Sequence, residues 1–236
     1  DLEAAFGHPD VAADYRQRAD RIAKAVHDLC AIPGGLLADT PAHLHYSEQT
    51  NAMGVLLDVV PKDEQEAVMG KVLSNEDGHP PQGMALSDSS IYFRFYVARA
   101  MDHAGLSDRY VGSLGPWRKM LDLGLTTWAE TAEPTRSDDH AWSAHPNYDL
   151  LTLVAGIRPA SPGFKTVLVA PSPGPLTSLK ARLAHPLGDI DVDYRKTGDA
   201  WTFRVTLPAG LTGMFRWNGE TTPLVGGINT VDFVRR

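Results

Sequence analysis

The chain has 236 residues, of which 43% are hydrophobic, and this is enough to bury the core of one large domain or two modest ones. Its 29 acidic and 22 basic residues give a formal charge of −7, and no stretch interleaves basic with aromatic residues, so we expect no nucleic acid and no membrane as partners. No apolar run approaches the roughly 20 residues of a membrane-spanning helix. The single cysteine, Cys30, excludes an intramolecular disulfide and a thiolate metal site, and we expect it to pack in the core.

The first two-thirds of the chain carry the three- and four-residue spacing of amphipathic helices. Ser47 precedes the second of these patterns as a helix cap, and Pro116 is expected to kink or divide the fifth. Residues 75–83 are polar and rich in proline and glycine, so we expect a loop there. The patterns predict helices over residues 11–29, 48–59, 63–73, 91–104, 108–123 and 147–155.

After Pro159 the pattern changes to an alternation of apolar and polar residues, which is typical of β-strands. Turn residues separate the runs, and Asn218-Gly219 is the strongest hairpin signal among them. Regular short strands broken by turns predict a β-sandwich. We therefore expect a helical domain over residues 1–158 and a β-sandwich over residues 159–236. Its strands are expected over residues 165–170, 179–183, 189–194, 201–207 and 213–217.

Residues 125–146, between the last two helical patterns, are richer in carboxylates, imidazoles and indoles than any other part of the chain. Their prolines indicate a loop, and loops held by a helical scaffold often carry catalytic groups. Sugars are bound by aromatic faces and by polar groups that hydrogen-bond hydroxyls, and this run supplies both. The alternative is a structural loop whose tryptophans anchor the core and whose Asp and Ser residues cap the next helix. The candidates for sugar contacts are Trp128, Glu130, Asp138, Asp139, His140 and Trp142.

Three short motifs in this part of the chain resemble those of a known enzyme family. They read T-T-x-x-E, S-x-x-H-x-W and A-G-I-x-P, and they are formed by Thr126, Thr127 and Glu130, by Ser137, His140 and Trp142, and by residues 155–159. In this order and spacing they resemble the second half of the catalytic domain of bacterial α-L-rhamnosidases, glycoside hydrolase family 78. The resemblance covers essentially the whole chain.

This resemblance implies an α+β multidomain fold, in which half of an (α/α)6 toroid is followed by an antiparallel, jelly-roll-like β-sandwich. It also implies an inverting glycoside hydrolase that releases terminal α-L-rhamnose from glycosides or polysaccharides. The general acid of the family lies in an upstream motif resembling D-x-P-Q-R-D-E-R, which this sequence lacks. We therefore expect the chain to be a fragment that is inactive, or nearly so, without that acid.

An inverting glycosidase places two carboxyls roughly 6.5–9.5 Å apart, one to protonate the leaving oxygen and one to activate a water. The resemblance makes Glu130 the second of these, the general base, whereas Glu133 competes with it on local chemistry alone. The expected substrate-binding residues are Trp128, Asp139, His140 and Trp142. Packing between helix ends and capping of turns are the competing structural roles for these side chains.

We expect a carbohydrate substrate and no cofactor. His43 and His45 have no third ligand at a useful spacing, so no metal site is expected. Half a toroid leaves an apolar face uncovered, which predicts either a missing N-terminal half of the barrel or a self-association partner. Two other functions stay open, namely a non-catalytic carbohydrate-binding or interaction fragment and a toroid glycosidase that acts on another sugar. The compartment also stays open, with the bacterial periplasm or exterior favoured over the cytoplasm.

Overall fold

The computed structural model describes residues 2–76, 85–132 and 134–234, and the chain divides into two compact units, Asp1–Leu106 and Ser107–Arg236. Each unit has its own buried side chains. Most of the loop expected over residues 75–83 lies outside the described residues. The domain boundary expected after residue 158 stays a prediction, and the first strand of the sandwich begins beside it, at Ile157.

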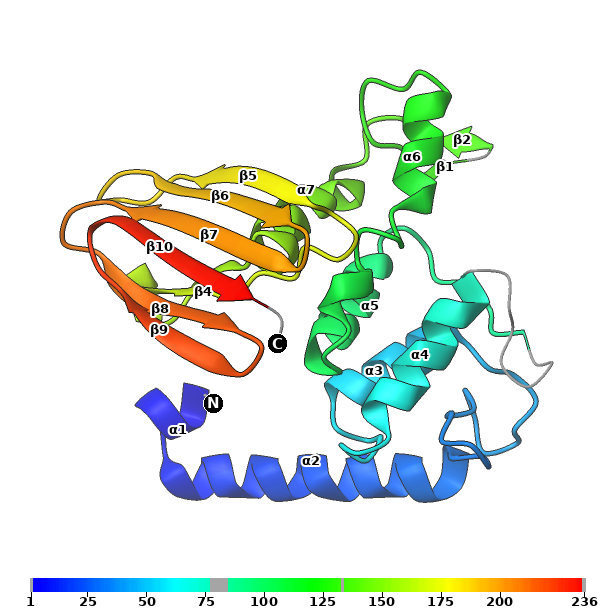
Figure 1. The fold of residues 1–236 in the computed structure, drawn as a ribbon. Coiled ribbons are helices and arrows are strands. Elements are labelled where there is room, and N and C mark those ends of the chain that lie inside the picture. The colour runs from blue at the N-terminus through cyan, green and yellow to red at the C-terminus, as the bar shows by residue number, and fades with distance from the viewer. Residues whose placement is uncertain (1, 77–84, 133, 235–236) are drawn as a thin grey trace. The chain divides into compact units, whose positions relative to one another are not determined.

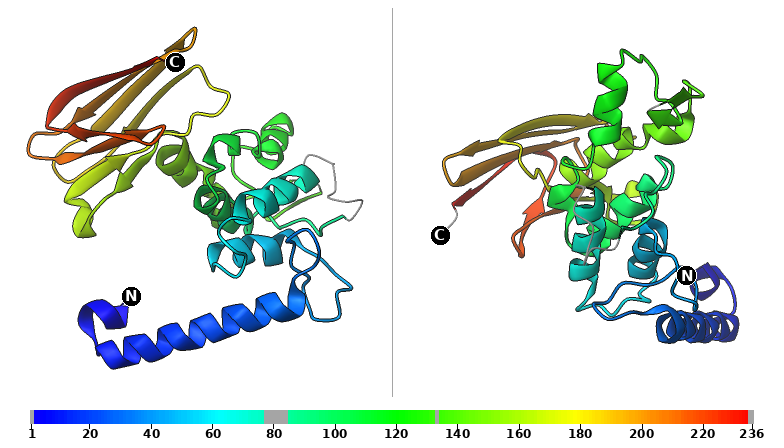
Figure 2. Two further views of the ribbon diagram at one scale, coloured as in Figure 1. Left: turned by 60° about the horizontal axis from the view of Figure 1, so that its bottom comes forward. Right: turned by 90° about the vertical axis from the view of Figure 1, so that its right-hand side faces the viewer.

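The first unit is helical, and its helices follow the amphipathic patterns of the sequence (Figure 1). The longest, α2, runs unbroken from Pro9 to Cys30, with Pro9 in its first turn (Figure 2). Ser47 caps α3, since its hydroxyl accepts the Thr50 amide proton at an N–O distance of 3.2 Å. The helices are α1 Leu2–Phe6, α2 Pro9–Cys30, α3 Glu48–Leu56, α4 Gln65–Glu76 and α5 Arg94–His103.

Local hydrogen bonds explain where two helices differ from the expected ranges. Helix α5 begins at Arg94 and not at residue 91, because the Phe93 amide donates to the Ser90 hydroxyl and residues 91–93 form turns instead. The helix expected over residues 108–123 is divided into the 3-10 turn η2 (Ser107–Arg109) and helix α6 (Gly115–Asp122). Pro116 lies in the first turn of α6, where its missing N–H leaves no helical bond unmade.

The second unit ends in a β-sandwich of two four-stranded sheets that lie face to face (Figures 1 and 2). The strand order is β10-β7-β6-β5 in one sheet and β3-β4-β8-β9 in the other. Strands β4 and β8 run parallel, so the second sheet is mixed and not wholly antiparallel. The strands are β3 Ile157–Pro159, β4 Thr166–Val169, β5 Ser178–Leu183, β6 Ile190–Thr197, β7 Ala200–Leu207, β8 Thr212–Trp217, β9 Glu220–Leu224 and β10 Gly227–Val234.

Inward-facing residues of both sheets form one core. The rings of Tyr194, Phe203 and Phe215 are completely buried there, and the Phe203 and Phe215 centroids lie 4.9 Å apart. The hairpin predicted at Asn218-Gly219 is confirmed between β8 and β9, where both residues have positive φ (49° and 81°), as a two-residue type I′ turn requires.

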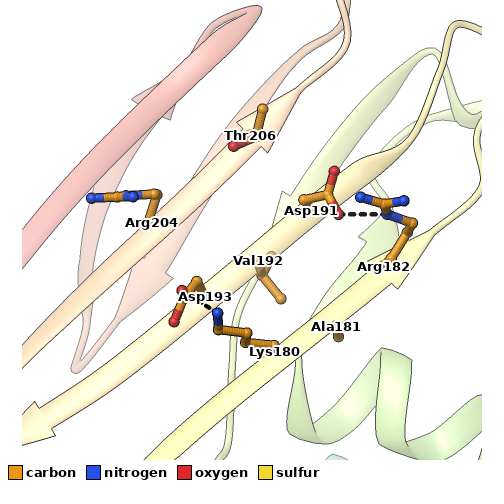
Figure 3. Close-up of a pocket in the computed structure, with 8 residues that line it drawn as sticks. All are labelled: Lys180, Ala181, Arg182, Asp191, Val192, Asp193, Arg204 and Thr206. Atoms are coloured by element: carbon orange, nitrogen blue, oxygen red, sulfur yellow. Dashed lines mark hydrogen bonds and ion pairs between the residues drawn. The ribbon is translucent and has the colours of Figure 1, made fainter.

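Ion pairs across strands cover part of the outer face of the sandwich (Figure 3). Lys180 and Arg182 of β5 lie opposite Asp193 and Asp191 of β6, with N–O distances of 3.3 and 2.7 Å. With Arg204 of β7 these residues line a shallow hollow of 370 Å³. Exposed pairs of this kind contribute little stability, so their main effect is to favour one register of the two strands.

The chain enters the sandwich through helix α7 (Pro146–Asp149), the π-helical turn η4 (Leu150–Val154) and then Gly156, whose φ is 77°. A Cβ atom on Gly156 would lie 2.2 Å from the carbonyl carbon of Ala170 and 2.4 Å from its oxygen. The Ala170 amide donates to the Gly156 carbonyl at 2.9 Å, which holds the two backbones at this spacing. Glycine alone combines the left-handed conformation with so close an approach.

Gly156→Ala is expected to lower the free energy of unfolding by on the order of 3 kcal/mol, because a left-handed alanine and a backbone clash both add to the cost. Gly163→Ala is the matched control, since Gly163 also has a positive φ (69°) but no atom within 4 Å of the added Cβ. Gly163→Ala should lower the free energy of unfolding by only roughly 1–2 kcal/mol, the cost of a left-handed alanine. Urea unfolding followed by circular dichroism measures both, and equal losses would contradict the clash at Gly156.

Asp58 connects three helices of the first unit just after α3. Its backbone is left-handed, with a φ of 54°, and its Oδ1 accepts hydrogen bonds from His103 Nε2 and Gln65 Nε2, both at 2.8 Å. The hydrogen bond from His103, followed by that from Gln65, lowers the pKa of the Asp58 carboxyl below its ordinary value of 3.8. The folded state therefore favours the ionised carboxylate.

Asp58→Asn is expected to reduce the free energy of unfolding at pH 6 by less than about 1 kcal/mol, because the Asp58 side chain is 65% exposed and water screens the pair. The folded pKa lies below the unfolded one, so this contribution is present above about pH 5 and is lost as the pH falls through the folded pKa. Urea unfolding of wild type and variant should differ at pH 6, and the difference should shrink as the pH falls below the ordinary Asp pKa of 3.8 and through the folded one. A difference that persists or grows in acid would refute this role.

Candidate active site

The segment expected as a loop over residues 125–146 is folded back on itself by main-chain hydrogen bonds. Strands β1 (Thr131–Ala132) and β2 (Thr135–Arg136) pair antiparallel at its tip. The Glu130 amide donates to the carbonyl oxygens of Arg136 and Ser137, at 2.9 and 3.3 Å, and the His140 amide donates to the Trp128 carbonyl at 2.7 Å. The segment is thus a hairpin held by hydrogen bonds between its two sides, and these bonds fix the backbone positions from which its side chains extend.

Glu130 lies at the start of this hairpin, next to Ala129, which is completely buried. Its side chain is 25% exposed, and its Oε2 lies 3.0 Å from Nε of Arg136, whose side chain is 76% exposed. Buried Ala129 and the two hydrogen bonds donated by the Glu130 amide hold the backbone of Glu130 in place. The Arg136 guanidinium orients its carboxylate. An ion pair with so exposed a partner is weak, so Arg136 can be displaced from the carboxylate by a ligand.

Of the other expected binding residues, Asp139, His140 and Trp142 follow the second strand of the hairpin, and Trp128 precedes its first strand. The His140 and Trp142 rings are in edge contact, with centroids 4.1 Å apart and planes at 62°, and His140 Nδ1 lies 2.9 Å from the Ser137 hydroxyl. Trp142 is 47% exposed. Trp128 is half-buried, and its carbonyl accepts the hydrogen bond from the His140 amide. Asp139, next to His140 in the chain, is exposed. The competing base Glu133 lies outside the described residues.

The structure thus places Trp128, His140 and Trp142 in one hydrogen-bonded and packed segment. Glu130 is connected to this segment by the hydrogen bond from its amide to the Ser137 carbonyl, and the Ser137 hydroxyl contacts the His140 ring. Thr127 contributes to the same folding, since its hydroxyl donates to the Asp138 carbonyl. The threonine and serine of the two sequence motifs are therefore supports of the hairpin, and the carboxylate, imidazole and indole are the groups they hold.

A buried cluster beneath the hairpin was missed by the sequence reasoning. Asp149 is completely buried, and its Oδ2 accepts hydrogen bonds from His145 Nδ1 at 2.8 Å and from the Tyr110 hydroxyl at 3.1 Å. The Trp117 indole packs edge-on against the His145 ring at 4.9 Å, and its Nε1 donates to the Ser143 carbonyl at 2.7 Å. We name Tyr110, Trp117, His145 and Asp149 the buried bracket. The four-residue spacing of His145 and Asp149 was the available signal.

Among residues 2–76, 85–132 and 134–234, no group of three or more His, Cys, Asp or Glu side chains is arranged to hold a metal ion. Within the same part of the chain, no helix combines the length and apolar character needed to cross a membrane. His43, one of the two histidines considered for metal binding, instead lies 2.9 Å from the Leu29 carbonyl through its Nε2.

Comparison with known proteins finds a family match for the sandwich and a likeness of fold for the whole chain. Residues 156–229 match the family model described as the bacterial alpha-L-rhamnosidase C-terminal domain. No curated protein matches the chain in sequence. Residues 156–229 include Gly156 and nearly all of the sandwich, and the match confirms the resemblance for this segment.

Solved structures extend the likeness to the helical part. The α-L-rhamnosidase from Dictyoglumus thermophilum is similar over 99% of this chain and 30% of its own, with 18% identity and a TM-score of 0.80. The family 78 rhamnosidase of Bacillus sp. GL1 is similar over 91% of this chain and 24% of its own, with 24% identity and a TM-score of 0.77. The Streptomyces avermitilis α-L-rhamnosidase, solved with L-rhamnose, is similar over 98% of this chain and 25% of its own, with 17% identity and a TM-score of 0.74.

The chain spans 24–30% of the length of these three structures. At these identities the likeness shows the fold, and it confirms the expected fold class of helices from a toroid followed by a β-sandwich. Residues 156–229 therefore match the bacterial alpha-L-rhamnosidase C-terminal domain, and the chain as a whole has the fold of the corresponding part of the α-L-rhamnosidases.

Proposed function

We propose that this chain supplies the C-terminal half of the catalytic barrel, with its sandwich, of an inverting α-L-rhamnosidase that releases terminal α-L-rhamnose from glycosides or polysaccharides. The observation that carries the proposal is a glutamate, Glu130, held by two main-chain bonds on a hairpin in a chain of rhamnosidase fold. The Streptomyces structure with L-rhamnose supports the choice of sugar.

Glu130 acts as the general base in this proposal. Its carboxylate takes a proton from the water that attacks the anomeric carbon, on the face opposite the leaving oxygen. The second carboxyl, which protonates that oxygen, comes from a part of the barrel outside this sequence, since the chain corresponds to under a third of the structures that it resembles. Substrate entry displaces the exposed Arg136 from Glu130 and frees the carboxylate for its water.

The returning side of the hairpin binds the sugar. Because Nδ1 of His140 is engaged with Ser137, Nε2 is the ring nitrogen that meets a ring hydroxyl. The indole of Trp142, nearly half exposed, offers an apolar face to the methyl group of rhamnose, and Trp128 adds apolar surface beside it. Asp139 accepts a hydrogen bond from a second hydroxyl. Polar contacts set the orientation of the sugar, and the indoles supply the apolar contact.

An apolar groove in the first unit supports the proposed partner. Helices α2 and α3 line a hollow of 590 Å³, and Ile22 and Leu29 on α2 are 65% and 56% exposed. At the wall of the hollow, Oε1 of Gln49 is buried without a hydrogen-bond partner among the described residues. Apolar surface of this kind is a protein contact site. The remaining part of the barrel covers it in the proposed enzyme, and a second copy of the chain is the alternative occupant.

One observation favours a second candidate function. The Glu130 carboxylate is engaged by Arg136, which is the arrangement expected of a hairpin that binds sugar without hydrolysing it. In that case the chain is a non-catalytic carbohydrate-binding fragment, and Glu130 orients Arg136 toward sugar hydroxyls. An exo-acting glycosidase with another sugar as substrate would use the same residues in the same roles.

Glu130→Gln in the full-length gene product is expected to lower kcat on p-nitrophenyl α-L-rhamnoside by roughly a hundred- to ten-thousand-fold, because the amide cannot accept the proton of the water. The affinity for L-rhamnose should change little. Glu220→Gln, an exposed carboxylate on β9 of the sandwich, is the matched control and should leave kcat unchanged.

The outcomes separate the parts of this proposal. If the gene product is active and Glu130→Gln leaves its kcat unchanged, Glu130 is not the base. A product that binds L-rhamnose without hydrolysing the rhamnoside would favour the binding fragment, and activity on a different glycoside alone would change the sugar. Full activity of the 236-residue chain by itself would contradict the assignment of the general acid to a missing part.

A further inference from the structure

We propose that the buried bracket, Tyr110, Trp117, His145 and Asp149, is a set of positioning residues for the sugar-binding side of the hairpin. The bracket holds the backbone of Ser143 and His145, and through it the relative placement of the His140 and Trp142 rings. This inference rests on the proposed function, because it assigns the bracket a role in substrate affinity.

The first step is the burial of the bracket. Tyr110 and Trp117 are 2% and 4% exposed, and the side chains of His145 and Asp149 are 7% and 0% exposed. A buried carboxylate is destabilising unless its oxygens are hydrogen-bonded, so Asp149 strongly favours the one arrangement in which the imidazole and phenol both reach it. The bracket therefore has few alternative conformations of similar energy.

The second step is the connection from the bracket to the hairpin. The 3-10 turn η3 (Ala141–Ala144) contains Trp142 and Ser143. Trp117 donates to the Ser143 carbonyl, while the Ser143 amide donates to the His140 carbonyl at 3.0 Å, so this residue is held from both sides. His145 ends the turn, and its carbonyl accepts the amides of Tyr148 and Asp149, both at 3.0 Å. Trp142 lies between His140, whose amide donates to the Trp128 carbonyl, and Ser143, so the backbone is held before and after it.

The third step is the energetic consequence. Trp142 is 47% exposed, so packing against the core restrains its indole less than it would restrain a buried one. A rigid backbone on both sides reduces the conformational freedom that sugar binding must remove, which raises affinity without adding a contact. Glu130 is held separately, by its bonds to Arg136 and Ser137. Loss of the bracket should therefore raise KM more than it lowers kcat.

The experiment uses two tyrosines that are both almost completely buried, at 2% and 0% exposure for Tyr110 and Tyr194. Tyr110→Phe removes the bond to Asp149, whereas Tyr194→Phe removes a bond to the Ala155 carbonyl, 2.8 Å away, in the sandwich core. Trp117→Phe removes the bracket's bond to Ser143 and is the second test variant. Ser143→Ala is a further control, since its buried Oγ has no partner among the described residues and the carbonyl that Trp117 binds is kept.

The first readout is the set of indole N–H signals of the chain, labelled with ¹⁵N at its five tryptophans. Tyr110→Phe and Trp117→Phe should shift or broaden the Trp142 signal and leave those of Trp201 and Trp217, in the sandwich, unchanged. Tyr194→Phe and Ser143→Ala should leave the Trp142 signal as in the wild type. This readout needs no substrate, so it decides on the bracket even if the gene product proves inactive on rhamnosides.

The second readout is the kinetics of the full-length gene product. Each of the two bracket variants should raise KM roughly three- to tenfold, the effect of about one lost hydrogen bond, with kcat within about twofold of wild type. Tyr194→Phe should change neither constant. The proposal is overturned if the Trp142 signal is indifferent to both bracket variants, or if Tyr194→Phe raises KM as much as Tyr110→Phe does. Inactivity of the wild type would count against the proposed function and leave the indole result to judge the bracket.

Discussion

The candidate site depends on a carboxylate that is completely removed from water. Asp149 would destabilise the fold if its oxygens were left without donors, and the phenol of Tyr110 and the imidazole of His145 both donate to it. These donors come from a point 39 residues upstream and from the preceding helical turn. Satisfying one buried carboxyl group therefore fixes the path of the chain as it leaves the hairpin that carries Glu130, His140 and Trp142.

The segment that follows Asp149 leads directly into the sandwich. Asp149 ends α7, the π-helical turn η4 follows it, and the Tyr194 hydroxyl donates to the Ala155 carbonyl at the end of that turn. Gly156 then passes within van der Waals contact of the Ala170 backbone, which only a glycine allows. The first strand of the sandwich thus follows directly on the helical turns that come after the hairpin. The hairpin and the sandwich belong to one compact unit.

Much of this architecture could be predicted because it is encoded locally. The alternation of apolar residues predicted the strands from β4 to β8, and Asn218-Gly219 predicted a turn that both its positive φ values confirm. The late start of α5 was not predicted, since the Ser90 hydroxyl competes with the helix for one amide. The parallel pairing of β4 and β8 and the bond from Tyr110 to Asp149 join distant residues, and no local pattern carries such information.

The residues of the candidate site could be predicted from the sequence, but the hairpin that they form could not. The sequence indicated that carboxylates, imidazoles and indoles gather over residues 125–146, and their resemblance to rhamnosidase motifs suggested their roles. It could not show that the Thr127 hydroxyl and the Glu130 and His140 amides fold this segment into a hairpin, because those bonds use backbone acceptors that any residue supplies. The roles of Glu130, Trp128, Asp139, His140 and Trp142 in catalysis and binding stay predictions.

The central claim is that Glu130 activates a water for inverting attack on an α-L-rhamnoside. Proton NMR of the full-length gene product acting on such a glycoside distinguishes the anomer of rhamnose released first, before mutarotation mixes the two. The account predicts β-L-rhamnose as the first product, and its absence when Glu130 is replaced by glutamine. First release of the α anomer, or release of β-L-rhamnose at an undiminished rate without the Glu130 carboxylate, would contradict it.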